Sequence, residues 1–277
     1  MLPRIRITQL GLSRTAARNV HTPSSLPPFT RSSLDAIKSA LAQPPPWSPT
    51  NLPDHTVGFS RGRVATEAAV LIPLLNVGNK PHVLMEVRSS TMRTHAGEVS
   101  FPGGRMDPTD ESLVHTALRE TQEELALSPD HVEVLGALDS PEYSLGNRSR
   151  VWPIVGFVHG STDQSPSPNS SSTTLPSFQL DKLLASPDEV AAVLPLPLSA
   201  LLDPSRQRVH HFRIDARRPY YTTKVGDLIA QPPDLSAQDC RTLDKLEVWG
   251  LSGWFLNRLA WTVGWLDRPP AGPEYED

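Results

Sequence analysis

The stretch that decides how this chain is organised is "FPGGRMDPTDESLVHTALRETQEELAL", residues 101–127. Its paired glycines are a strong break, and the residues that follow predict a helix from about Pro108 to Leu125. Asp107 suits the N-cap of this helix, and Pro108 suits its first position. Apolar runs flank the segment on both sides, so we expect the helix to pack against a sheet.

Three glutamates distinguish the predicted helix. At about 100° per residue, Glu120, Glu123 and Glu124 lie on one face. Like-charged neighbours cost roughly a few tenths of a kcal/mol per pair, so a solvated acidic stripe is one interpretation. The other is that a divalent cation cancels the repulsion. The opposite face is expected to pack on the sheet and carries Val114, Leu118, Thr121 and Leu125.

The cation interpretation fits the chemistry of the segment. Mg²⁺ prefers carboxylate oxygens and usually binds through one or two of them together with substrate phosphates. Gly103 and Gly104 precede the helix and would let the backbone approach a diphosphate, because glycine has no Cβ. The pattern therefore predicts a site for Mg²⁺ or Mn²⁺ beside a diphosphate.

This segment resembles the Nudix box, the metal-binding loop–helix–loop of Nudix hydrolases, written G-x5-E-x7-R-E-U-x-E-E-x-G-U with U apolar. One extra residue separates the glycine from the first acid, so either Asp110 or Glu111 takes the structural acid role that faces the box arginine. Thr121 replaces an apolar residue, and Ala126 replaces the glycine that ends the helix. The matching residues are Gly104, Glu111, Arg119, Glu120, Glu123, Glu124 and Leu127.

The resemblance implies an α/β Nudix fold, a mixed β-sheet sandwiched between α-helices. It also implies catalytic roles for the residues of the box. Glu120 and Glu124 would hold Mg²⁺ or Mn²⁺, with Glu123 binding directly or through water, and Arg119 would orient the structural acid. The general base stays open between Glu120 and the loop acid Glu98.

The residues just upstream, "LMEVRSSTMRTHAGEVSFPGG", resemble a second signature, that of the coenzyme A diphosphatase branch: L-L-T-x-R-S-x followed by R-x3-G-x3-F-P-G-G. Glu86 stands where a small polar residue is usual. The resemblance implies a small-molecule substrate, coenzyme A or its acyl or oxidised derivatives, cut at the diphosphate. The matching residues are Arg88, Ser89, Arg93, Gly97, Phe101, Pro102, Gly103 and Gly104.

Substrate contacts are expected outside the metal ligands. Arg88 and Arg93 would bind phosphates, His95 would add a donor, and Gly103 and Gly104 would lie against the diphosphate. Aromatic residues could stack on the adenine, although we expect Trp249 to pack in the core. The aromatic candidates are Trp249, Tyr220 and Tyr221.

Three other functions compete with this one. A Nudix hydrolase of another nucleoside diphosphate derivative, such as ADP-ribose or NADH, would share the box but not the upstream signature. A non-catalytic nucleotide-binding module would usually lack a box glutamate, whereas this chain keeps them all. An adaptor would dock partners through the Ser/Pro-rich segment 160–178, which shows no clear ligand motif.

The chain is expected to divide into four parts. Residues 1–31 form a tail, and 32–63 a short helix with a proline-rich linker. Residues 64–266 form the Nudix domain, in which 160–178 are a disordered insertion, and 267–277 are a second tail. Within the domain, strands are predicted at 64–75, 82–88, 97–101, 132–139, 151–158 and 188–197, a late hairpin at 210–214 and 219–225, and a helix at the C-terminal end.

Composition narrows the partners and the compartment. A net charge of −4 and a pI of about 6.1 argue against nucleic acid. No run of about 18 apolar residues occurs, so no transmembrane helix is expected. Cys240 is the single cysteine, which fits a reducing compartment. The first 34 residues contain arginines and serines but no acid, which favours mitochondrial targeting over a peroxisomal or cytoplasmic location.

Overall fold

The computed structural model describes residues 26–42, 66–144, 149–161, 173–215, 217–229 and 245–270. Most of the predicted targeting tail and linker, much of the predicted insertion, and Cys240 lie outside these residues. No helix in the described part of the chain combines the length and apolarity needed to cross a bilayer.

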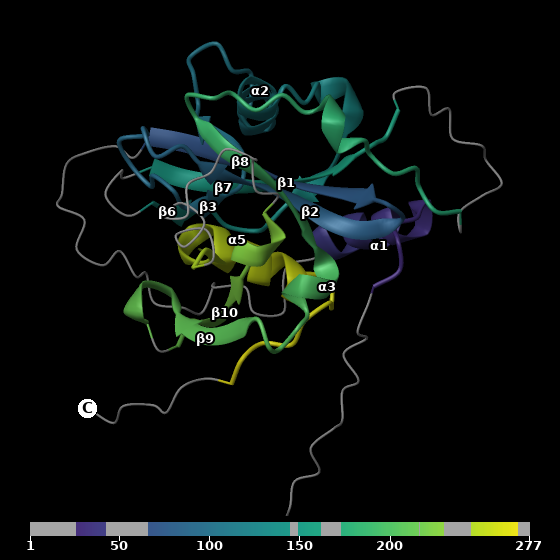
Figure 1. Ribbon diagram of the computed structural model, residues 1–277, viewed down its shortest axis with the longest axis vertical. Coiled ribbons are helices and arrows are strands. Elements are labelled where there is room, and N and C mark those ends of the chain that lie inside the picture. Colours follow the sequence, from purple (N-terminus) through teal and green to yellow (C-terminus); the bar gives the residue numbers. More distant parts are fainter. Residues whose placement is uncertain are drawn as a thin grey trace, which may run out of the picture.

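An eight-stranded mixed sheet forms the centre of the protein, with the order β3-β2-β1-β7-β5 (Figure 1). β1 and β7 are parallel, β8 extends the sheet beside β2, and the short strands β4 and β6 pair with β1 and β7. The strands are β1 (Thr66–Val77), β2 (Lys80–Arg88), β3 (Val99–Ser100), β4 (Gly103–Arg105), β5 (Val132–Ala137), β6 (Glu142–Tyr143), β7 (Ser149–Val158) and β8 (Val190–Pro197).

Helices cover both faces of this sheet, as predicted. Helix α2 (Leu113–Leu125) lies on one face, and α1 (Arg31–Ala42) and α5 (Gly250–Thr262) lie on the other (Figure 1). The side chains of β1 need cover on both faces of the sheet, because they alternate between them. Ala69 and Leu71 pack beneath α2, while Ile72 and Leu74 join the core on the α5 side. A strand buried on both faces has few polar positions.

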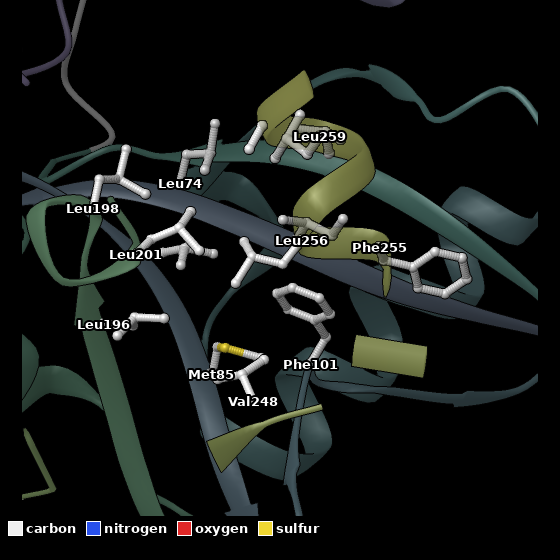
Figure 2. Packing of buried hydrophobic residues seen from close by; sticks show 14 of the residues in the cluster. Leu74, Met85, Phe101, Leu196, Leu198, Leu201, Val248, Phe255, Leu256 and Leu259 are labelled. Carbon is white, nitrogen blue, oxygen red and sulfur yellow. The ribbon is translucent and has the colours of Figure 1, made fainter. Parts of the chain in front are cut away.

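The larger core fills the space between the sheet and α5 (Figure 2). Leu74 and Met85 of the sheet meet Leu256 and Leu259 of α5, and all four are at most 1% exposed. Each such side chain contributes about 1.5–3 kcal/mol when fully buried. α5 is therefore held firmly against the sheet, and its N-terminal end lies near Phe101 beside the glycine turn.

A second sheet of three strands packs on α5. It consists of β9 (Gln207–His211), β10 (Pro219–Lys224) and β11 (Glu247–Val248), and β9 and β10 form the predicted hairpin. Asn257 of α5 fastens it: its side chain accepts a 2.9 Å hydrogen bond from Tyr221 N and donates a 2.8 Å bond to Tyr221 O. The C-terminal segment is thus joined to the main sheet through α5.

Helix α1 is bound to the sheet by a carboxylate. Glu133 of β5 accepts hydrogen bonds from Arg31 (2.7 Å), Lys38 (2.6 Å) and His159 (2.8 Å). Burial alone would raise the pKa of Glu133, but these three donors lower it to about 2. Helix α1 is therefore a fixed part of the fold.

Part of the predicted insertion is ordered. Residues 173–178 are described, and within them Leu175 and Phe178 are buried. Asn76 donates a 2.9 Å hydrogen bond to Leu175 O, and Thr174 pairs with Thr30. The prediction that the whole of 160–178 lacks packed structure is wrong for this end, which carries two large apolar side chains.

Helix α2 starts later than predicted. It begins at Leu113, and its N-cap is Ser112, whose Oγ accepts a 3.1 Å hydrogen bond from His115 N. The prediction of Asp107 as N-cap is wrong, because the Asp107 carboxylate accepts a hydrogen bond from Thr109 N (2.9 Å) and closes a separate turn.

Helix α2 ends at Ala126, which is left-handed (φ 55°) and donates a 2.9 Å hydrogen bond to Gln122 O. Alanine takes the place of the usual glycine here, but its Cβ makes the left-handed conformation less favourable than it would be for glycine.

Candidate functional site

The glycine pair on β4 brings helix α2 into contact with the sheet backbone. Gly103 has φ +149°, and a Cβ there would collide with the carbonyl oxygen of Ala69. A Cβ on Gly104 would overlap the carboxylate of Glu120. Glycine is therefore required at position 103, where the obstacle is the backbone of β1, and at position 104 it leaves room for the Glu120 carboxylate, which would otherwise have to move.

Glu124 is buried between α2 and the sheet. It is 4% exposed, and its Oε2 accepts a 2.8 Å hydrogen bond from Gly103 N. Burial raises its pKa, and the negative charge of Glu86 raises it further. The first of the two interpretations, a solvated acidic stripe, does not hold for Glu124, which is buried against the sheet, whereas the Glu123 side chain is 57% exposed.

Glu86, which departs from the upstream signature, is a functional candidate that was not predicted from the sequence. It lies on β2 and is fully buried; its Oε1 accepts a 3.2 Å hydrogen bond from Ser100, and its Oε2 has no partner among the described residues. Arg88 Nη1 lies 3.6 Å from Glu86 Oε1 and 3.7 Å from Glu124 Oε1. A carboxylate inside the apolar run 82–88 was the signal that could have identified it.

The charges of two further carboxylates reach the buried pair, that of Glu120 acting on Glu124 and that of Glu189 acting on Glu86. Glu120 is half-buried, and burial raises its pKa. The charge of Glu189, just before β8, raises the pKa of both Glu86 and Glu120. Arg88 is the cation within 4 Å of Glu86 and Glu124 in the described residues. This excess of buried negative charge needs a cation or protons to balance it.

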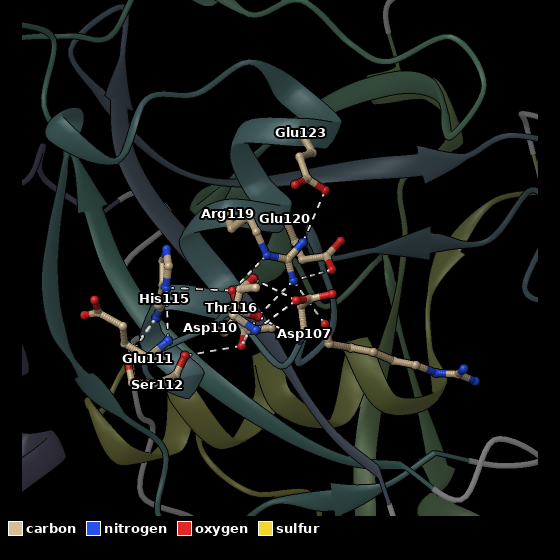
Figure 3. Close-up of polar contacts among 11 residues, drawn as sticks. Asp107, Asp110, Glu111, Ser112, His115, Thr116, Arg119, Glu120 and Glu123 are labelled. Atoms are coloured by element: carbon tan, nitrogen blue, oxygen red, sulfur yellow. Dashed lines mark hydrogen bonds and ion pairs between the residues drawn. The ribbon is translucent and has the colours of Figure 1, made fainter.

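Arg119 organises the outer part of the site (Figure 3). It binds Asp110 with two hydrogen bonds of 2.9 Å and also contacts Glu120 (3.0 Å) and Glu123 (3.2 Å). Its guanidinium holds the pKa of Asp110 well below the ordinary range. Asp110, not Glu111, therefore faces the arginine; the Glu111 side chain is exposed.

The donor set fits a divalent cation without forming a closed cage. Across the described residues, no three acidic or histidine side chains are arranged to hold an ion together. Arg119 accounts for this, because it draws Glu120 and Glu123 toward itself. Glu124 and Glu120 remain one helical turn apart over the glycine pair, which suits Mg²⁺ bound through two carboxylates, waters and substrate oxygens.

A cavity of about 540 Å³ opens beside the glycine pair. It is lined by Arg88, His95, Gly103 and Gly104, as expected for substrate contacts. Arg93 is exposed and does not line it. This volume is typical of a small-molecule site.

The aromatic residues of the cavity differ from expectation. Trp249 is 47% exposed and lines the cavity, so the prediction that it packs in the core is wrong. Trp249 directly precedes the first turn of α5, where the chain leaves the core. Tyr220 is buried and lines the same cavity, and its hydroxyl accepts a 2.9 Å hydrogen bond from Gly250 N.

The comparisons with known proteins agree with this geometry. The NUDIX domain family matches residues 65–204, which contain strands β1 to β8, the acidic helix and the short helix α3 (Leu198–Leu201). The chain belongs to the Nudix family. It is a hydrolase of nucleoside diphosphate derivatives, and Nudix hydrolases generally use divalent metal ions such as Mg²⁺ or Mn²⁺.

Three relatives illustrate the match. An uncharacterized Nudix hydrolase NudL of Pectobacterium atrosepticum is 31% identical over 73% of this chain and 84% of its own length. Nudix hydrolase 3 of Caenorhabditis elegans is 34% identical over 69% of this chain and 70% of its own length. The mitochondrial coenzyme A diphosphatase NUDT8 of Homo sapiens is 40% identical over 55% of this chain, and the match spans 56% of the human protein.

Asp110→Asn should separate the two candidate structural acids of this Nudix box. The substitution removes the charge that holds Arg119, so we expect the free energy of unfolding to fall by about 2 kcal/mol. Glu111→Gln is the matched control and should change it by less than about 0.5 kcal/mol. Urea unfolding measures both; equal effects of the two variants would contradict the assignment of Asp110.

The buried carboxylates predict how stability depends on pH in the absence of metal. Burial raises the pKa of Glu86 from 4.5 to about 7, and burial together with the charge of Glu86 raises that of Glu124 to about 9. The folded protein therefore holds more protons than the unfolded chain above pH 4.5, so stability falls as pH rises. Between pH 7 and 9 in EDTA we expect a loss of about 1 kcal/mol per pH unit, measured by urea unfolding. Glu86→Gln should make this slope shallower, because the charge of Glu86 raises the pKa of Glu124. An unchanged slope would contradict this interaction between the two carboxylates.

Proposed function

We propose that this protein hydrolyses the diphosphate of coenzyme A and of its acyl or oxidised derivatives. The products would be adenosine 3′,5′-bisphosphate and 4′-phosphopantetheine or its acyl form. The observation that carries the proposal is the cavity at the glycine turn, where Arg88 of the upstream signature lies 3.7 Å from Glu124 of the box. The human relative is named as a coenzyme A diphosphatase, which supports the same substrate class.

The arrangement suits a phosphorus–oxygen bond cleavage. The oxygen of a water molecule attacks one phosphorus, a new P–O bond forms as the bridging P–O bond breaks, and the leaving phosphate keeps the bridging oxygen. Glu120 and Glu124 would hold Mg²⁺ or Mn²⁺, with Glu123 contributing through water. The bound cation would neutralise the diphosphate and make the attacking water more acidic.

The chain's own residues would position the substrate and accept the proton. Arg88, in reach of both the cavity and the buried carboxylates, would bind a diphosphate oxygen. Among the described residues of the cavity lining, Glu98 alone has a carboxylate, and its Oε2 lies 2.9 Å from His95 Nδ1. Glu98 is therefore the base that a water in the cavity would reach, with Glu120 as the alternative.

An assay with coenzyme A and Mg²⁺ or Mn²⁺ tests the proposal. We expect the two phosphorylated products by chromatography, and slower cleavage of ADP-ribose and NADH. Glu124→Gln should lower kcat by at least roughly a hundredfold while the fold remains, because glutamine can still accept from Gly103 N–H. If coenzyme A stays intact while ADP-ribose is cleaved rapidly, the proposed substrate is wrong. If Glu124→Gln is fully active, the proposed role of Glu124 as a metal ligand is wrong.

We also infer a mitochondrial location. The arginine-rich, acid-free N-terminus supports it, as does the word "mitochondrial" in the name of the human relative. A fluorescent protein that carries residues 1–31 at its N-terminus should accumulate in mitochondria. A fusion that stayed in the cytosol would contradict the inference.

A further inference from the structure

The cavity has a second cationic end, far along the chain from the Nudix box. Strand β9 ends at His211, and the 3₁₀ turn η4 (Phe212–Ile214) follows. His210, His211 and Arg213 from this region line the same cavity as Gly103 and Gly104. The C-terminal sheet, which packs on α5 (Figure 1), therefore supplies one wall of the site.

Arg213 has no carboxylate of its own among the described residues. Its Nε is buried without a hydrogen-bond partner, and its guanidinium lies 5.0 Å from the centre of the Phe212 ring. The negative charge of Glu142 acts on the Arg213 guanidinium from a distance. The Glu142 carboxylate already accepts hydrogen bonds from Arg218 and from Trp254 Nε1. A half-buried guanidinium without an anion is an unbalanced charge.

The backbone at Arg213 is also unusual. Its φ of 56° and ψ of 32° place it in the left-handed region, which residues other than glycine rarely adopt. Such conformations persist where the surrounding structure fixes them, and they are frequent at ligand sites. Here the conformation comes directly after a strand that faces the cavity, and it sets the position of the arginine side chain.

The charges of the whole lining point to a ligand with more than one anionic group. In the described lining, three arginines (Arg88, Arg105 and Arg213) stand against the single carboxylate of Glu98. The wall also contains apolar side chains such as those of Val70, Phe101 and Phe255. A nucleotide that carries a diphosphate at one end and a separate phosphate group beyond its ribose would match these features.

We propose that Arg213, with His210 and His211, forms a second anion subsite that binds the phosphate monoester on the ribose of the substrate nucleotide. The proposal rests on the proposed function, because it places the diphosphate at the glycine pair. A guanidinium pairs with a phosphate through two parallel hydrogen bonds, which a neutral hydroxyl cannot replace. The subsite would select 3′-phosphorylated nucleotides over those with a free 3′-hydroxyl.

Coenzyme A and dephospho-coenzyme A, which differ only by the 3′-phosphate, provide the test. Wild-type protein should show kcat/KM at least about tenfold higher for coenzyme A, the effect of a charged hydrogen bond. Arg213→Ala should bring the two substrates to within about twofold of each other. Arg213→Gly removes the same side chain and suits the left-handed backbone, so it gives the same answer should the alanine variant fold poorly. Arg208→Ala is the matched control, since Arg208 is exposed on β9 and does not line the cavity; it should keep the wild-type ratio.

A binding measurement makes the test independent of turnover. In calorimetry, wild-type protein should bind adenosine 3′,5′-bisphosphate more tightly than adenosine 5′-monophosphate, and both Arg213 variants should lose this preference. Equal kcat/KM for the two substrates in wild-type protein, or an Arg213 variant that keeps the ratio, would overturn the subsite while the proposed function stands. Cleavage of neither substrate by wild-type protein would instead overturn the proposed function.

Discussion

The burial of negative charge between helix α2 and the sheet is the constraint on which the site depends. Glu124 and Glu86 are almost inaccessible to water, and Arg88 is their nearby cation. Isolated carboxylates in such surroundings are strongly disfavoured unless they are protonated or paired. The fold tolerates the pair because Gly103 donates a backbone N–H to Glu124, and because a divalent cation can complete the balance. Because Glu124 is bonded to Gly103, which lines the cavity, a cation held by Glu124 would lie at the cavity wall.

Most of the main sheet could be predicted from the sequence. The runs at 64–75, 82–88 and 151–158 appear as β1, β2 and β7 with ends shifted by a few residues. Long apolar runs bounded by breaks leave few alternatives. The start of α2 was harder to predict, because both Asp107 and Ser112 are good capping residues and only tertiary contacts choose between them. Once Asp110 binds Arg119, the residues before Ser112 are held in a turn and cannot join the helix.

The environment of each glutamate could not be predicted from the helix alone. A helical wheel places Glu120, Glu123 and Glu124 on one side, but it does not show how closely the sheet approaches. The glycine pair removes two side chains from that contact, so Glu124 enters the interior while Glu123 stays in solvent. The wrong placement of Trp249 in the core and the omission of Arg213 have a related reason. Their place in the cavity depends on how the C-terminal sheet packs on α5, far along the chain from the box.

Metal uptake is the measurement that tests the central claim most directly. Mn²⁺ titrated calorimetrically into the folded protein should bind with a saturable heat, with or without coenzyme A present. Glu124→Gln should weaken this binding by at least about tenfold, whereas Glu111→Gln, which alters an exposed acid of the same box, should bind as wild type does. If the wild-type protein takes up no Mn²⁺ or Mg²⁺ under either condition, the buried carboxylates do not form a metal site and the account is wrong.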